Sequence, residues 1–277
     1  MLCDLDGVVY RGEQACEGAV EGLTDAREAG VRLLFMTNNA SRPPEAVAEH
    51  LTRLGLRTEP EEVLGASQVA AQVLAERVER GEVDLGPDGV VLAVGGVGVG
   101  RALERAGLPW VSPAAVRETA DSARAPRVAA VVQGYGPQVG VADLTEAAYA
   151  VRAGAVWIAT NDDATLPTER GLAPGNGSLV AAVTHATGAR PEVVGKPHAP
   201  AYRIAVQQLG LPVEECLMLG DRLDTDIAGA VGVGLRSALV LTGVSSREDV
   251  LDTPEELRPD HVAPTIPGLH FLWRNDE

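Results

Sequence analysis

The stretch Asp4-Leu5-Asp6-Gly7-Val8-Val9-Tyr10 decides the fold, because two carboxylates two residues apart directly follow a short apolar run. Residues i and i+2 of a strand point to the same face, so Asp4 and Asp6 can both reach one site. In open α/β sheets, ligands bind at the carboxyl ends of the strands. One carboxylate can attack phosphorus, and the other can protonate the leaving oxygen and later deprotonate water. A solvated turn or a calcium loop is the alternative, but the Glu of a calcium loop is missing.

Apolar runs rich in branched residues alternate with helical patterns on both sides of the middle of the chain. Residues 31–36, 216–219 and 238–241 are predicted strands, whereas residues 43–54 and 202–209 have the spacing of helices. Such alternation is typical of parallel strands joined by crossover helices, so the predicted fold class is α/β with a Rossmann-like parallel sheet.

The middle of the chain has an alternation of its own. It contains predicted strands at 90–94, 128–132 and 155–159 and predicted helices at 99–106 and 144–151. Residues 81–89 have the composition of a linker, and the block ends near residues 188–191. We therefore predict an inserted α/β domain over residues 80–190 and a discontinuous core domain made of residues 1–79 and 191–277.

Polar residues follow the other predicted core strands. Thr37, Asn38 and Asn39 follow the strand at 31–36, and their hydroxyl, amide and backbone N–H groups can bind phosphate oxygens. A capping turn would explain these three residues equally well. Lys196 follows an apolar pair, and a lysine buried there costs free energy unless anions such as Asp4 and a phosphate pair with it. A lysine that faces solvent is the alternative.

The stretch Gly220-Asp221-Arg222-Leu223-Asp224-Thr225-Asp226 follows the strand at 216–219 and adds carboxylates. Mg²⁺ prefers oxygen ligands and is often held by one or two carboxylates together with water and substrate phosphate. Asp4, Asp221 and a backbone carbonyl supply that set, and Asp226 is expected in the shell around it. Arg222 and Asp224 are expected to face solvent or to pair with each other.

The segments that begin at Asp4, Thr37, Gly195 and Gly220 resemble, in this order, the four motifs of haloacid dehalogenase superfamily phosphatases. The insert between the second and third motifs resembles the C2-type cap of that superfamily. The resemblance implies Asp4 as nucleophile, Asp6 as acid and base, and a cap that closes to select the leaving group. It also implies magnesium on Asp4, the Asp6 carbonyl and Asp221, and phosphate binding by Thr37 and Lys196.

The stretch 160–178 resembles the cap loops of actinobacterial glycerol-3-phosphate phosphatases, which makes Asn161, Asp163 and Arg170 candidate substrate-binding residues. Purely structural loop residues are the alternative for these three. The expected substrate is a small phosphate monoester, best glycerol 3-phosphate, with a sugar phosphate, a nucleotide, pyridoxal phosphate or an aryl phosphate as alternatives. A catalytically idle binding protein with the same fold is the alternative of another class. Caps of this type form dimer interfaces in relatives, so the resemblance also suggests a homodimer.

Charge and composition exclude several other functions. The formal net charge of −16 disfavours nucleic acid and anionic membranes as partners. No apolar run reaches the roughly 20 residues that span a bilayer. The three cysteines are widely spaced and predict neither a disulfide framework nor a zinc site, which favours a cytoplasmic location.

Two further stretches carry expectations. Residues 95–100 are rich in glycine, but the spacing of a dinucleotide-binding loop fails at Arg101, so a tight strand-to-helix turn is predicted. Only three residues precede Asp4, whereas a strand usually has about five. We therefore expect either a short first strand or a natural protein that begins upstream.

Overall fold

The computed structural model describes residues 1–119, 125–168 and 170–274. The chain forms two compact units, and each unit contains its own parallel sheet. Unit 1 consists of Met1–Thr37, Pro44–Leu64 and Lys196–Glu277, and unit 2 consists of Asn38–Pro43 and Gly65–Gly195. The predicted α/β class with a Rossmann-like sheet is confirmed.

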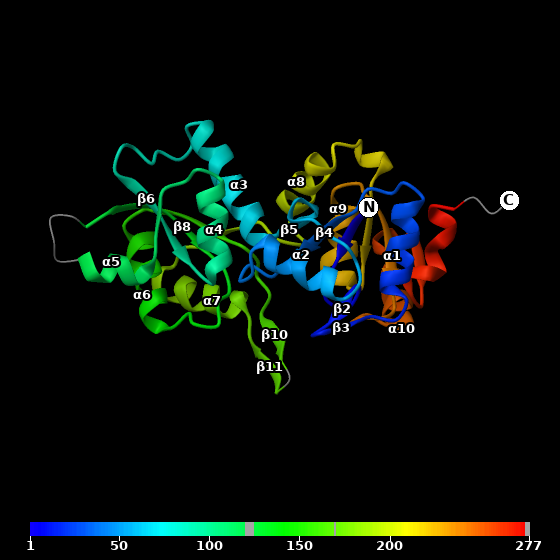
Figure 1. Cartoon of the computed structure of the whole chain (residues 1–277). Coiled ribbons are helices and arrows are strands. Elements are labelled where there is room, and N and C mark those ends of the chain that lie inside the picture. The colour runs from blue at the N-terminus through cyan, green and yellow to red at the C-terminus, as the bar shows by residue number, and fades with distance from the viewer. Residues whose placement is uncertain (120–124, 169, 275–277) are drawn as a thin grey trace. The chain divides into compact units, whose positions relative to one another are not determined.

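Unit 1 has a six-stranded sheet in the order β15-β14-β13-β1-β4-β5. Figure 1 labels β4 and β5 of this sheet. The pairings from β15 through to β4 are all parallel. A small antiparallel hairpin, β2–β3, follows the first strand. The strands are β1 (Leu2–Asp4), β2 (Tyr10–Arg11), β3 (Gln14–Ala15), β4 (Leu34–Thr37), β5 (Val63–Gly65), β13 (Leu217–Gly220), β14 (Arg236–Val240) and β15 (His261–Ala263).

Helices connect these parallel strands, as the alternation in the sequence predicts. The helices are α1 (Ala19–Glu28), α2 (Pro44–Arg53), α8 (Ala199–Leu209), α9 (Ala228–Gly232) and α10 (Arg247–Asp252). A π-helical turn, η3 (Leu223–Ile227), precedes α9, and 3₁₀ turns cover Pro60–Glu62, Val213–Glu215, Glu255–Leu257 and Ile266–Leu272. The first strand has three residues, in line with the expected short start.

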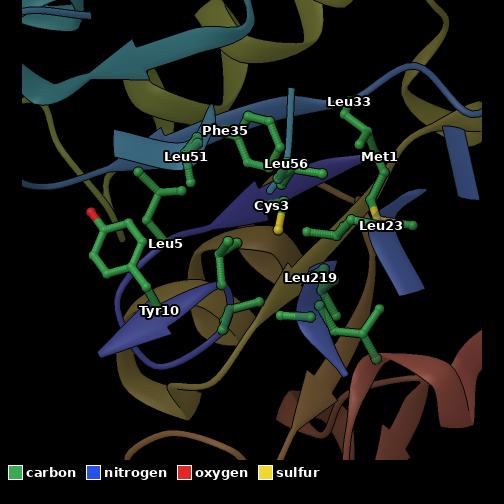
Figure 2. Close-up of a cluster of buried hydrophobic side chains, with 14 of the residues drawn as sticks. Met1, Cys3, Leu5, Tyr10, Leu23, Leu33, Phe35, Leu51, Leu56 and Leu219 are labelled. Atoms are coloured by element: carbon green, nitrogen blue, oxygen red, sulfur yellow. The ribbon is translucent and has the colours of Figure 1, made fainter. Parts of the chain in front are cut away.

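Buried apolar side chains on one side of the unit 1 sheet form its core (Figure 2). Cys3 of β1, Phe35 of β4 and Leu219 of β13 pack with Leu23 of α1. Burial of these side chains holds the ends of β1, β4 and β13 side by side, because apolar burial is the main favourable term in folding. All three cysteines of the chain lie in described segments and are free thiols, and Cys3 and Cys216 are buried as expected.

Unit 2 has a five-stranded parallel sheet in the order β12-β9-β8-β6-β7, with a separate hairpin formed by β10 and β11. The strands are β6 (Gly89–Val94), β7 (Trp110–Val111), β8 (Arg127–Gln133), β9 (Val156–Ala159), β10 (Thr165–Thr168), β11 (Gly171–Pro174) and β12 (Glu192–Val193). The helices are α3 (Ala66–Glu79), α4 (Val97–Arg105), α5 (Pro113–Thr119), α6 (Val141–Arg152) and α7 (Asn176–Thr187).

The two units divide the chain differently from the predicted boundaries at 79/80 and 190/191. Helix α3 belongs to unit 2 because it packs on α4 and β9, and the second division falls at 195/196. The apparent linker at 81–89 is a loop inside unit 2, where the Arg127 guanidinium donates to the Asp84 carbonyl at 3.3 Å. Composition therefore identified a loop at 81–89 but not a domain boundary. The boundary depends on the packing of α3, which the local sequence does not show.

The predicted tight turn between β6 and α4 lies at Gly95 and Gly96, and the rest of the glycine-rich stretch 95–100 is the first turn of α4. The glycines of this stretch allow close packing of residues 38–43. The Gly98 N–H donates to the Ser41 carbonyl at 3.2 Å. A Cβ atom added at Gly98 would lie 2.4 Å from the carbonyl oxygen of Ala40. This backbone contact explains why Asn38–Pro43 belongs to unit 2. Among the described residues, no helix is long and apolar enough to cross a membrane.

Candidate active site

The carboxyl ends of β1, β4 and β13 carry the predicted core residues of the site. Asp4 ends β1, and its register partner Met36 directly precedes Thr37 at the end of β4. On the other side of β1, Leu219 of β13 pairs with Cys3, which places Asp221 just beyond the same edge of the sheet. Parallel pairing of three neighbouring strands therefore gathers residues that are far apart in the sequence.

Lys196 is the cation at the centre of this group. Its ammonium group donates to Asp4 Oδ1 and, at 2.7 Å, to Asp226 Oδ1, and its side chain is 5% exposed. Burial alone would lower the pKa of Lys196, but attraction to Asp226 and Asp4 outweighs it and raises that pKa well above its usual value. The structure thus places Lys196 in a buried ion-pair network, and the alternative of a solvent-facing lysine is wrong.

Asp4 is a buried carboxylate that lies close to two others, those of Asp221 and Asp226. Burial raises its pKa well above the usual value, Lys196 opposes the rise, and Asp226 and Asp221 add to it. A carboxylate in this position gains from any cation that shares the site, because a nearby positive charge favours the ionised form. Asp4, Asp221 and Asp226 each offer an oxygen, and these three oxygens lie within 4.8 Å of one another.

The two aspartates after β13 differ in how their oxygens are used. Asp226 Oδ2 accepts the backbone N–H groups of Asp221 at 3.2 Å and Arg222 at 3.1 Å, and its Oδ1 accepts from Lys196. Asp221 Oδ2 accepts the Val244 N–H at 2.7 Å, whereas the buried Asp221 Oδ1 has no hydrogen-bond partner. Burial, with repulsion from Asp226 next, raises the pKa of Asp221 to about 6.

An unpartnered, fully buried carboxylate oxygen is costly unless a cation or donor faces it. The orphaned oxygen of Asp221, beside Asp4, therefore fits a hard divalent cation such as Mg²⁺, which prefers oxygen ligands. The oxygens of Asp226 already accept hydrogen bonds from Lys196 and from the turn. This arrangement makes Asp226 an anchor for Lys196 and for the turn that carries Asp221.

The remaining predicted residues of unit 1 lie around this buried group. Thr37 is buried at the end of β4, whereas the side chain of Asp6 is exposed. Arg222 and Asp224 pair with each other at 2.8 Å on the surface, as expected, and the hydrogen bond from Arg222 lowers the pKa of Asp224. Asp4 is therefore buried and Asp6 is exposed. Two carboxylates in such different environments can take different roles in one site.

Three of the predicted residues in unit 2 form one hydrogen-bonded group. Asn38 Nδ2 donates to Asp163 Oδ2 at 3.1 Å, and Asn161 Nδ2 donates to the Asn38 carbonyl at 2.7 Å. Asn161 is buried, and its Oδ1 accepts the Asp163 N–H at 3.2 Å. Asn161 therefore acts as a brace between the 38–43 segment and the loop after β9, while Asp163 is half-buried.

Asn39 and Arg170 occupy different positions within the same unit. Asn39 Oδ1 accepts the backbone N–H and the hydroxyl of Ser41 at 2.9 and 2.7 Å, which is the capping geometry that the sequence left open. Arg170 lies in the exposed turn between β10 and β11, where its N–H donates to Thr168 Oγ1 at 3.3 Å. The structure does not record Arg170 within the Asn38–Asn161–Asp163 group.

Sequence reasoning missed two features that support the carboxylates of unit 1. The Tyr202 hydroxyl donates to the Thr225 carbonyl at 2.6 Å and fixes the turn that carries Asp226. The segment Thr242–Ser245 after β14 contacts Asp221 through the Val244 and Ser245 N–H groups. The sequence carried a signal for the second of these features. Thr242-Gly243 directly follow the apolar run 238–241, which places them at the carboxyl end of a core strand.

Comparisons with known proteins agree with this architecture. The family model described as haloacid dehalogenase-like hydrolase matches residues 1–109, and a second HAD-like hydrolase model matches residues 193–269. The D-glycerol 3-phosphate phosphatase of Mycobacterium tuberculosis is 44% identical over 270 residues, which are 98% of this chain and 70% of that protein. The 5'-nucleotidase YutF of Bacillus subtilis is 36% identical, covering 96% of this chain and 94% of that protein.

A solved structure gives the same result. The glycerol phosphate phosphatase of M. tuberculosis in complex with magnesium superposes with a TM-score of 0.84 at 44% identity, covering 97% of this chain and 75% of that chain. The chain therefore belongs to the haloacid dehalogenase-like hydrolase family, and it is a hydrolytic enzyme. The resemblance inferred from the four sequence motifs is confirmed.

Proposed function

We propose that this chain is a magnesium-dependent phosphatase that hydrolyses a small phosphate monoester through an aspartyl phosphate on Asp4. The observation that carries the proposal is the buried ion-pair network of Asp4, Lys196 and Asp226 beside the orphaned Asp221 Oδ1. An unpartnered carboxylate oxygen beside this network is a position that a cation can fill. The similarity to named phosphatases over nearly the whole chain supports the same chemistry.

In the first step, the Asp4 carboxylate forms a bond to phosphorus while the bond from phosphorus to the ester oxygen breaks. Asp6 gives its proton to the departing oxygen, which leaves as the alcohol. Water then attacks phosphorus and gives its proton to Asp6 as the Asp4–phosphorus bond breaks. The products are inorganic phosphate and the regenerated Asp4 carboxylate. The exposure of Asp6 suits a group that exchanges protons with a leaving group and with water.

The other residues of the site bind and neutralise charge. Lys196, Thr37 and backbone N–H groups are positioned to oppose the negative charge of the transferring phosphoryl group. Asp4, Asp221 and the Asp6 carbonyl would hold the cation. A bound magnesium ion supplies charge neutralisation at the phosphoryl oxygens. Tyr202 and Asp226 hold Lys196 and the η3 turn in place, so the charge at the site is arranged before substrate arrives.

We assign the catalytic core to unit 1 and the cap to unit 2. Within the cap, the hydrogen-bonded polar pair Asn38 and Asp163, together with Arg170, is the candidate set for selecting the leaving group. Glycerol 3-phosphate is the preferred substrate, supported by the similarity to the M. tuberculosis enzyme. A nucleotide is the second candidate, supported by the similarity to the B. subtilis nucleotidase, and sugar, pyridoxal and aryl phosphates complete the test panel.

The test is phosphate release from that panel with magnesium and with EDTA. The wild type is compared with Asp4→Asn and with the control Asp224→Asn, because Asp224 is an exposed carboxylate paired with Arg222. We expect magnesium-dependent turnover that Asp4→Asn abolishes and Asp224→Asn preserves. Turnover that persists in Asp4→Asn, or its absence from a folded wild type, would reject the mechanism. The second result would favour a catalytically idle binding protein.

Location and assembly follow as part of the same proposal. The free cysteines and the acidic net charge favour a cytoplasmic protein that acts on small molecules and does not bind nucleic acid. A homodimer is proposed from the resemblance of the insert to caps that dimerise. Light scattering coupled to size-exclusion chromatography tests the assembly, and a mass of 28.8 kDa would reject the dimer.

A further inference from the structure

A fifth segment of unit 1, which lies outside the four motifs, contacts the first motif, the fourth motif and the β2–β3 hairpin. Residues Thr242–Ser245, called here the 242–245 segment, follow β14. Thr242 Oγ1 donates to the Gly7 carbonyl at 2.7 Å, and Arg11 Nη2 of the β2–β3 hairpin donates to the Gly243 carbonyl at 2.9 Å. The segment therefore joins the turn after the nucleophile to the hairpin that follows it.

The same segment also holds the aspartate that follows β13. The Val244 N–H donates to Asp221 Oδ2 at 2.7 Å, and the Ser245 N–H donates to the Asp221 carbonyl at 3.0 Å. Ser245 Oγ accepts the Leu223 N–H at 3.1 Å, at the start of the π-helical turn. Asp221 is thus fixed through both its backbone and one of its two carboxylate oxygens.

Two glycines make this contact sterically possible. A Cβ atom added at Gly243 would lie 1.8 Å from Asp221 Oδ2, and one added at Gly7 would lie 2.4 Å from the same oxygen. The Gly243 φ angle lies outside the left-handed region, so only the close approach of Asp221 requires a glycine there. Gly7 has a φ of +87°, so its backbone conformation also favours glycine.

We propose that the 242–245 segment is a positioning element that makes Asp221 Oδ1 the oxygen available to the metal ion. Oδ2 is enclosed by Gly7 and Gly243 and accepts the Val244 N–H, so the carboxylate cannot turn that oxygen toward Asp4. Oδ1 is left buried and without a partner. The inference rests on the proposed function, because it assigns Asp221 to a cation.

The test is magnesium affinity, measured by isothermal titration calorimetry on the full chain. Gly243→Ala places a methyl group against Asp221, whereas the control Gly232→Ala adds one where nothing lies within 4 Å. Loss of an outer-shell contact usually costs about 10–100-fold in metal affinity. We expect a loss of that size in Gly243→Ala, wild-type affinity in Gly232→Ala, and partial recovery of Gly243→Ala turnover at high magnesium concentration.

A gentler variant covers the case in which Gly243→Ala does not fold. Thr242→Val removes the hydroxyl that bonds the Gly7 carbonyl and adds no bulk to the segment. We expect a several-fold weaker magnesium affinity, smaller than that of the glycine variant. A folded Gly243→Ala or Thr242→Val protein with wild-type magnesium affinity would overturn the inference.

The design separates this inference from the proposed function. Magnesium binding by the wild type that is weakened in Gly243→Ala supports the positioning role even if no substrate of the panel turns over. Magnesium-dependent turnover in a Gly243→Ala protein of unchanged affinity rejects the positioning role and leaves the phosphatase proposal intact. A wild type that does not bind magnesium rejects both.

Discussion

Replacing Lys196 with methionine removes the only cation that hydrogen-bonds Asp4 and Asp226 among the contacts recorded in the described part of the chain. Methionine has a similar length and fills the same space, so packing changes little while the charge is lost. The side chains of Lys196 and Asp226 are 5% and 0% exposed. Water therefore cannot enter and replace the missing ammonium group without a rearrangement of the site.

The expected cost follows from this burial. Removing one partner of a buried ion pair usually costs about 3–5 kcal/mol, because the remaining charge stays buried and uncompensated. For a protein of this size each kcal/mol lowers the melting temperature by about 2–4 °C, so the expected fall is about 6–20 °C. The matched control is Arg222→Met, which breaks the surface pair with Asp224, where Arg222 is 39% exposed and Asp224 is 68% exposed. Such exposed pairs contribute about 0–1 kcal/mol.

The assay is thermal unfolding in EDTA at pH 8 and at pH 5.5, with circular dichroism to confirm folding at low temperature. Burial already raises the pKa of Asp4 in the folded state, and without the lysine that pKa rises further above its value in the unfolded state. The folded state then holds protons more tightly, so the variant gains stability as pH falls and the deficit shrinks at pH 5.5. A Lys196→Met protein that melts within 2 °C of Arg222→Met at pH 8 would refute this account of the network.

Three further predictions concern the same unit. Asp4→Asn should abolish turnover, yet it should stabilise the metal-free protein at pH 8 by about 1–2 kcal/mol. The reason is that it removes one of three carboxylates that lie close together. A lower melting temperature of the variant in EDTA would contradict this. The pKa of Asp221 is about 6 when folded and 3.8 in the reference state, so the folded state binds its proton more tightly. The unfolding free energy in EDTA should therefore fall, by at most about 3 kcal/mol, as pH rises from about 4 to about 6, and chemical denaturation across that range checks the sign. Tyr202→Phe leaves the Thr225 carbonyl without its donor and should cost about 1–3 kcal/mol, whereas Tyr149→Phe, at a side chain that is 64% exposed, should cost almost nothing in the same urea titration.

The core of the site could be predicted from the sequence because each of its parts follows an apolar run. Asp4, Thr37 and Asp221 lie after strands that pair in parallel, and parallel pairing makes their carboxyl ends meet. Lys196 was predicted on a charge argument, since a lysine among buried strands needs anions. Local pattern and electrostatics made these residues candidates, and the resemblance of the four motifs to the family assigned their roles.

Other features of the fold and of the site could not be predicted, because they depend on contacts between segments that are far apart in the sequence. The local sequence of such a segment does not show which segment it contacts. The sequence of helix α3 does not show which unit the helix joins, and its contacts with α4 and β9 place it in unit 2. Asn161 is a candidate substrate-binding residue because its loop resembles the cap loops of the family, and the sequence gives no sign that its amide donates to the Asn38 carbonyl. Thr242-Gly243 after an apolar run marks a strand end, but the sequence does not show that Asp221 Oδ2 lies where a Cβ atom of residue 243 would be.

The charges of the site account for how so acidic a protein can bind an anionic substrate. Asp4, Asp221 and Asp226 are three carboxylates, and Lys196 is the one ammonium group recorded among them, so the buried cluster is short of two positive charges when all are ionised. In the metal-free protein, burial first and then repulsion among these carboxylates raise the pKa values of Asp4 and Asp221, so both groups bind protons more tightly than they would in water. A divalent cation removes the same shortage and displaces those protons, because metal ligands must be deprotonated. The excess of carboxylates repels phosphate, but it also attracts a divalent cation. Phosphate binding depends on that cation.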